Sequence, residues 1–75
     1  MMSTGTIQSL DTRGFGFING DDGVRRFFPA REVRDVKFDA LIVGQRVGYK
    51  PASHPFKGPR AFTVTLLPME GQVAA

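Results

Sequence analysis

The chain has 75 residues, enough for one small domain and too few for a large, deep active-site cavity. It contains no cysteine and one histidine, which excludes disulfides, thiolate metal sites and histidine-rich metal clusters. Hydrophobic residues make up 41% and charged residues 23% of the chain, which is ordinary globular usage and argues against wholesale disorder. We expect no enzyme activity, no cofactor and no metal.

The net charge of +3 is unevenly distributed along the chain. All ten basic residues lie between Arg13 and Arg60, and seven of them are arginine. The same segment contains only five acidic residues. Arginine suits phosphates and flat aromatic bases better than lysine does. The excess of arginine therefore indicates either an anionic partner or a basic surface that only keeps the protein in solution.

Short segments separated by glycine and proline predict five strands. In chain order, the strands are residues 5–10, 14–19, 24–28, 46–50 and 61–67. A turn over residues 19–23 joins the second and third strands into a hairpin, and a loop with three prolines over residues 51–59 joins the last two. Residues 30–43 contain neither glycine nor proline, and they predict either a helix or a long loop with one helical turn.

Five short strands in one small domain predict an all-β fold, a closed or nearly closed barrel of the oligonucleotide-binding type. Closure is favoured because it removes exposed strand edges. The domain is expected over residues 5–67, between a disordered N-terminus over residues 1–4 and a flexible tail over residues 68–75. No apolar run approaches the roughly 20 residues that span a membrane, and no signal peptide is present, so we expect a cytoplasmic protein without a membrane partner.

The segment Arg-Gly-Phe-Gly-Phe-Ile over residues 13–18 is the most informative part of the sequence. In a strand, Phe15 and Phe17 lie on one face, while Gly16 and Ile18 lie on the other. Either the two rings fill the core, or the glycines let the barrel coil tightly while the rings face solvent as a stacking platform. The residues alone leave both alternatives open.

Several short motifs, in the same order and spacing, resemble the cold-shock domain. They are Gly5-Thr6-Ile7, Arg13-Gly14-Phe15-Gly16-Phe17-Ile18, Asp22-Gly23, Phe27-Phe28, Gly44-Gln45-Arg46-Val47 and Lys57-Gly58-Pro59-Arg60-Ala61. The resemblance covers about residues 5–67. It implies a five-stranded antiparallel barrel that binds single-stranded RNA or DNA on aromatic side chains, with a role as an RNA chaperone or as a regulator of transcription or translation.

The expected nucleic-acid-binding residues combine aromatic rings for stacking with cations for phosphate contacts. They are Arg13, Phe15, Phe17, Arg25, Phe27, Phe38, Phe56, Lys57 and Arg60. Phe56 is either a late stacking ring or a side chain that packs back on the barrel. The Arg25-Arg26 pair either contacts phosphates or blunts a strand edge.

With these rings on the surface, the core is left to other residues. It is expected to contain Ile7, Ile18, Phe28, Val33, Leu41, Val47, Tyr49, Phe62 and Val64.

The chain departs from the family pattern at several binding positions. Ser9 and Leu10 stand where an aromatic pair beginning with Trp is usual, and Pro29 and Ala30 stand where a histidine and a further aromatic are frequent. Fewer platforms predict weak binding, or binding shifted toward arginine contacts. The alternative is a divergent barrel that has lost nucleic-acid affinity and serves as a protein-interaction module. For either function we expect a monomer or a weak dimer.

The position of Ser9 is itself open. Simple alternation in a flat strand places it on the face of Ile7, toward the core. The resemblance places it on the binding surface.

Overall fold

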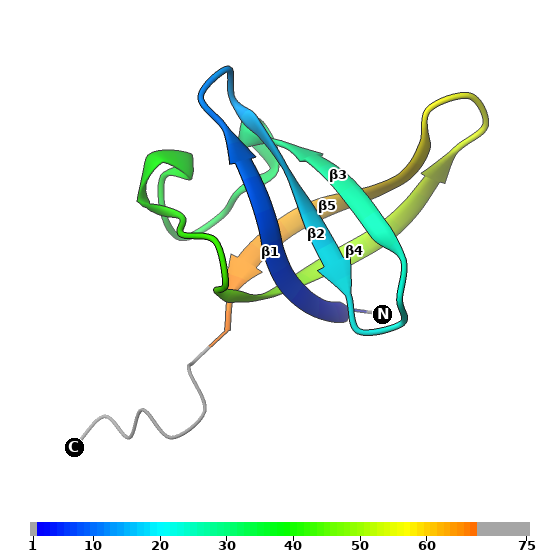
Figure 1. The fold of residues 1–75 in the computed structure, drawn as a ribbon, viewed down its shortest axis with the longest axis horizontal. Helices are drawn as coiled ribbons and strands as arrows, with labels where there is room; N and C mark the ends of the chain where they lie inside the picture. The colour runs from blue at the N-terminus through cyan, green and yellow to red at the C-terminus, as the bar shows by residue number, and fades with distance from the viewer. Residues whose placement is uncertain (1, 68–75) are drawn as a thin grey trace.

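The computed structural model describes residues 2–67, which form a closed five-stranded barrel (Figure 1). The strands are β1 (Ser3–Asp11), β2 (Phe15–Gly20), β3 (Arg25–Pro29), β4 (Arg46–His54) and β5 (Gly58–Leu66). Their order around the barrel is β1-β2-β3-β5-β4. Four pairings are antiparallel, and β3 closes against β5 in parallel where Phe27 lies opposite Arg60. The all-β, five-stranded barrel expected from the sequence is confirmed.

The connection between β3 and β4 contains two short 3₁₀ helices, η1 (Ala30–Glu32) and η2 (Phe38–Ala40). Residues 30–43, all of which the structure describes, form no continuous helix, so the loop alternative is correct. The chain after η1 is attached to β5. Val33 forms an isolated parallel bridge with Val64, and the Arg34 amide donates a hydrogen bond to the Val64 carbonyl (2.8 Å).

The last two strands are longer than predicted. Most of the expected loop over residues 51–59 is strand, because β4 continues to His54 and β5 begins at Gly58. Pro51 lies opposite Ala61 and Pro59 lies opposite Ser53. Proline lacks a donor N–H, and it is tolerated here because the outer part of a two-stranded hairpin has an open edge on each side. Figure 1 shows this hairpin projecting beyond the barrel.

The structure corrects the sequence prediction at the N-terminal end of the chain and does not describe the C-terminal end. Strand β1 already includes Ser3 and Thr4, which were expected in a disordered N-terminus. Pairing with Tyr49 and Gly48 of β4 accounts for their order. The expected flexible tail over residues 68–75 lies outside the described residues.

A bulge in β1 settles where Ser9 points. The pairing of β1 with β2 shifts register between Ile7 and Ser9, so that Ser9 lies opposite Phe17. Opposite residues share a face, so Ser9 lies on the face of Phe17. The extra residue is Gln8, which is exposed, while Ile7 is buried and Leu10 packs against the core. Simple alternation is therefore wrong here, since a bulge reverses the phase of the strand.

A second bulge lies in β5 and corrects the expected core. The pairing with β4 shifts register around Thr63, whose φ of 51° is in the left-handed region. As a result Ala61 and Val64, three residues apart, are both fully buried, and Phe62 is 36% exposed. The assignment of Phe62 to the core is thus wrong, and Ala61 takes its place. Thr63 is stabilised in this position by a hydrogen bond from its amide to the Glu32 carboxylate (3.1 Å).

The core fills the barrel with a few large side chains. It consists of Ile7, Ile18, Phe28, Leu41, Val47, Tyr49, Ala61 and Val64. Val33, also expected there, is partly buried against it. Gly16 makes room for Phe28, because a Cβ at this position would lie 2.8 Å from the Phe28 ring and 2.7 Å from the Ser9 carbonyl oxygen.

We predict that Gly16→Ala destabilises the barrel, because the added methyl group must displace buried backbone and a buried ring. Overpacking of this kind costs about 1–3 kcal/mol. Gly48→Ala is the matched control, since its methyl group would make ordinary contacts at 3.4 Å or more. Urea denaturation measures both free energies of unfolding. Equal losses for the two variants would contradict the close approach at Gly16.

Tyr49 generates a prediction for alkaline pH. Burial raises the pKa of the Tyr49 phenol, with a further contribution from the negative charge of Asp22. The unfolded chain releases the phenolic proton near its usual pKa of about 10, whereas the folded protein retains it to higher pH. The free energy of unfolding is therefore expected to decrease as pH rises above about 10. Denaturation between pH 8 and 11 should show a smaller decrease for Tyr49→Phe, and identical slopes for both proteins would contradict this account.

Candidate nucleic-acid interface

Three phenylalanine rings lie together on the outside of the barrel. Phe15 and Phe17 come from β2 and Phe27 comes from β3, directly opposite Phe17. Their centroids are 6.3 Å apart for Phe15–Phe17, 5.5 Å for Phe15–Phe27 and 5.8 Å for Phe17–Phe27. All three are partly exposed, so the alternative that places Phe15 and Phe17 in the core is wrong. We call these three residues the aromatic face.

Each ring of the aromatic face has an arginine guanidinium over it. The Cζ atom of Arg25 lies 3.9 Å from the Phe17 centroid, that of Arg60 lies 4.4 Å from Phe27, and that of Arg13 lies 5.2 Å from Phe15. These distances are within the range of cation–π attraction. The surface thus alternates flat apolar rings with cations, the combination that single-stranded nucleic acids require.

Neighbouring polar groups on β1 hold two of these arginines. The Arg13 Nε and Nη2 atoms donate to the Asp11 carboxylate at 3.0 and 3.1 Å, and the Arg13 amide donates to the same group at 2.8 Å. These hydrogen bonds lower the pKa of Asp11 and raise that of Arg13. Arg25 instead donates through Nε to the neutral Gln8 side chain at 2.8 Å. The sequence analysis missed Asp11 and Gln8; only the Asp-x-Arg spacing at residues 11–13 could have indicated the first.

Arg26 has a structural role that separates it from Arg25. Its side chain is 11% exposed, and Nη1 donates to the carbonyl oxygens of Ala52 (2.8 Å) and Arg60 (3.2 Å). Because those two residues are opposite each other in β4 and β5, Arg26 attaches the base of the hairpin to β3. Its neighbour Arg25 is exposed and belongs to the surface of the aromatic face.

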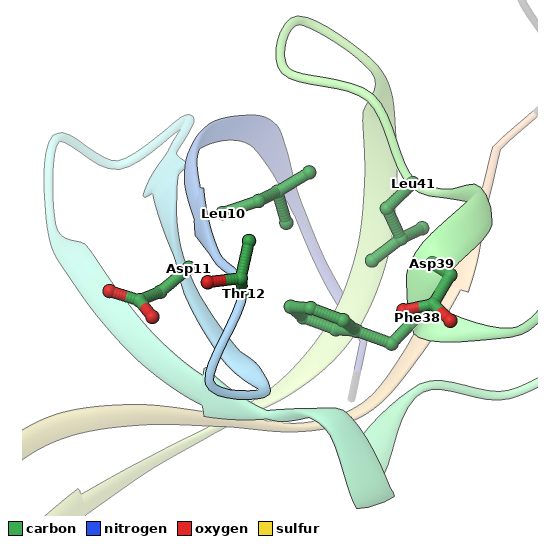
Figure 2. A pocket seen from close by; sticks show the side chains of 6 residues that line it. All are labelled: Leu10, Asp11, Thr12, Phe38, Asp39 and Leu41. Carbon is green, nitrogen blue, oxygen red and sulfur yellow. The ribbon is translucent and has the colours of Figure 1, made fainter.

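Phe38 lies beside the barrel rather than within the aromatic face. Its ring is partly buried, 6.1 Å from the ring of Phe28. Together with Leu10 and Leu41 it forms the apolar walls of a pocket of about 230 Å³. Figure 2 shows the ring extending across this pocket toward the end of β1. The remaining lining residues are Asp11, Thr12 and Asp39.

Phe56 and Lys57 lie at the tip of the β4–β5 hairpin. Phe56 is 93% exposed, so it does not pack back on the barrel. The amides of Phe56 and Lys57 both donate to Nδ1 of His54, at 3.1 Å each, which fixes the turn. Within residues 2–67, the hydrogen bonds and the ring contact of this tip join only residues 54–57. The structure thus divides the expected site residues between the aromatic face, this tip and the pocket of Phe38.

Residues 2–67 also bear on metal binding and on helical membrane spans. Within that range, no three histidine, aspartate or glutamate side chains gather in a group that could bind a metal ion. The same part of the chain contains no helix with the length and apolar character needed to cross a membrane.

The barrel and its exterior aromatic face define a small nucleic-acid-binding domain of the oligonucleotide-binding type, and the comparison with known families agrees. The profile described as "'Cold-shock' DNA-binding domain" matches residues 3–67, so the chain belongs to this family. Cold-shock domains are non-enzymatic domains that generally bind nucleic acids.

Among solved structures, Drosophila Unr CSD456 has a similar fold, with a TM-score of 0.73 and 25% sequence identity. The alignment covers 91% of this chain and 27% of that chain, so the present protein spans about a quarter of its length. A search of curated proteins found no match.

Proposed function

We propose that the protein binds single-stranded RNA or DNA by stacking unpaired bases on the aromatic face. The observation that carries this proposal is the set of three adjacent, partly exposed rings on β2 and β3, each accompanied by an arginine. Stacking of a base on an aromatic side chain contributes about 1–3 kcal/mol and tolerates any sequence, because every base has a flat face. Arg13, Arg25 and Arg60 supply positive charge for the phosphates.

The single strand is favoured over the duplex for a geometric reason. In a duplex the faces of the bases are stacked on one another, and only their edges and the backbone are accessible. A flat cluster of rings therefore finds a partner only where bases are unpaired. Binding to the open strand shifts the equilibrium of a structured RNA toward its unfolded form, which is the basis for a role as an RNA chaperone or regulator.

Two peripheral elements extend the proposed interface. Phe38 offers a further ring at the wall of its pocket, near the end of β1. Lys57 and Phe56, at the hairpin tip, offer a cation and an almost fully exposed ring to a strand that continues past the barrel. Both are expected to add less than the aromatic face, because Phe38 is partly buried and the exposed ring of Phe56 is not held in a stacking orientation.

The test is a titration with single-stranded and duplex oligonucleotides at several salt concentrations. With about four phosphates contacted, log affinity for the single strand should decrease with log salt concentration at a slope of about −2.8. Phe15→Ala and Phe17→Ala should each weaken binding about five- to 100-fold. Thermal stability should change little, in contrast to the 3–5 kcal/mol lost when a buried Phe is truncated.

Phe62→Ala is the matched control for these substitutions. Phe62 is an exposed ring on β5, opposite Lys50 of β4 and outside the aromatic face, so its removal should leave affinity unchanged. If the wild-type protein binds no single strand at low salt, the proposal is wrong and a protein-interaction module becomes the better interpretation.

A fourth ring should strengthen the interface at Ser9. Because the β1 bulge places Ser9 opposite Phe17 on the outer face, Ser9→Trp adds an indole beside the aromatic face. We expect affinity for single strands to rise about five- to 100-fold with no loss of stability. Oligonucleotide titration and thermal melting of the variant measure the two quantities. A loss of about 1–3 kcal/mol of stability without tighter binding would mean that the indole has been forced into the core.

A further inference from the structure

The guanidinium groups of Arg13, Arg25 and Arg60 lie over the rings of the aromatic face, in positions where bases would stack. A base that approaches the covered side of Phe17 meets Arg25 before it meets the ring, since the Arg25 Cζ atom lies 3.9 Å from the Phe17 centroid. It either displaces the guanidinium or stacks on the guanidinium's outer surface. A guanidinium is planar and stacks on flat aromatic groups, so the second arrangement gains contact without losing the first.

Arg25 is the arginine whose orientation best suits stacking of a base on its guanidinium. Its Nε atom donates to the Gln8 side-chain oxygen at 2.8 Å, which fixes the plane of the group above Phe17. Gln8 is exposed because it follows the inward-facing Ile7, and the β1 bulge places Ser9 on the same outer face. Within residues 2–67, no hydrogen bond engages the terminal amino groups of Arg25, so they are available to a base edge or a phosphate.

The charge of Arg25 also differs from that of Arg13. Arg13 is ion-paired with Asp11 at 3.0 Å, and the carboxylate cancels much of its field. Gln8 is neutral, so Arg25 keeps its full positive charge while its orientation is fixed. Arg25 thus combines orientation, charge and the shortest distance to a ring of the three arginines.

We propose that Arg25 is itself a base-stacking residue, that Gln8 positions it, and that the unit of recognition here is the layered pair of Phe17 and the Arg25 guanidinium. This inference rests on the proposed binding of single strands and adds that one base stacks on an arginine. It also accounts for the small Ser9 side chain opposite Phe17, since the flat group comes from β3 instead of β1.

The experiment measures binding of a single-stranded oligonucleotide that contains 2-aminopurine, whose fluorescence is quenched when the base stacks. Arg25→Lys keeps the charge and removes the flat group, so it should weaken binding at least about five-fold, reduce the quenching and leave the salt slope unchanged. Arg31→Lys, at an exposed position in η1, is the control and should match the wild type in all three measurements.

Gln8 is tested by the same measurements. Gln8→Ala should reduce both quenching and affinity at an unchanged salt slope, because Arg25 keeps its charge and loses its orientation. Gln8→Glu retains an acceptor at the same position and should retain the quenching. Thermal melting confirms that each variant is folded.

Two outcomes would overturn the inference, and they are distinguishable. If the wild type binds and Arg25→Lys equals it in affinity and quenching, Arg25 acts only as a charge and the stacking role is wrong. If the wild type does not bind single strands at all, the proposed function fails and the inference fails with it.

Discussion

The close approach of Phe28 to Gly16 determines which aromatic residues can face a nucleic acid. Phe28 is fully buried, and its ring occupies the space in which any side chain at position 16 would lie. Successive side chains of a strand point to opposite faces, so a strand that turns Gly16 toward the core turns Phe15 and Phe17 outward. A small barrel has room for few large rings, and placing Phe28 inside leaves its neighbours on β2 and β3 to form a surface.

The arginines complete this surface in a chain that has few aromatic platforms. Pro29 is buried opposite Phe15, and Ser9 is a small side chain opposite Phe17. Arg25 and Arg60 place flat, charged groups over two of the three rings; Arg25 remains exposed and Arg60 is partly buried. Cation–π contacts at exposed sites contribute about 0.5–1 kcal/mol each, enough to orient the side chains before a ligand arrives. Binding then loses less conformational entropy than it would with freely moving arginines.

The sequence was informative where alternation is regular and misleading where a bulge interrupts it. The burial of Ile18, Phe28 and Val47 follows from regular strands, and the exterior position of Phe27 follows from pairing with β2. The bulge at Thr63 reverses the phase of β5, which a pattern of alternating residues cannot reveal, so Phe62 was assigned to the core in error. Three prolines predicted a loop over residues 51–59, because a proline interrupts a strand inside a sheet. The prediction was wrong because these prolines lie along the open edges of a two-stranded hairpin, where proline is tolerated. The guanidinium–ring pairs depend on side-chain rotamers, which no local pattern encodes.

The most direct test of this account is a titration of the isotopically labelled protein with an unstructured single-stranded oligonucleotide, followed residue by residue by NMR. We expect the largest shift changes at the rings of Phe15, Phe17 and Phe27 and at the side-chain Nε–H of Arg25, with small changes at the exposed ring of Phe62. Shift changes confined to the β4–β5 hairpin, or absent from the aromatic face at saturating oligonucleotide, would contradict the claim that bases stack on the outer surface of β2 and β3.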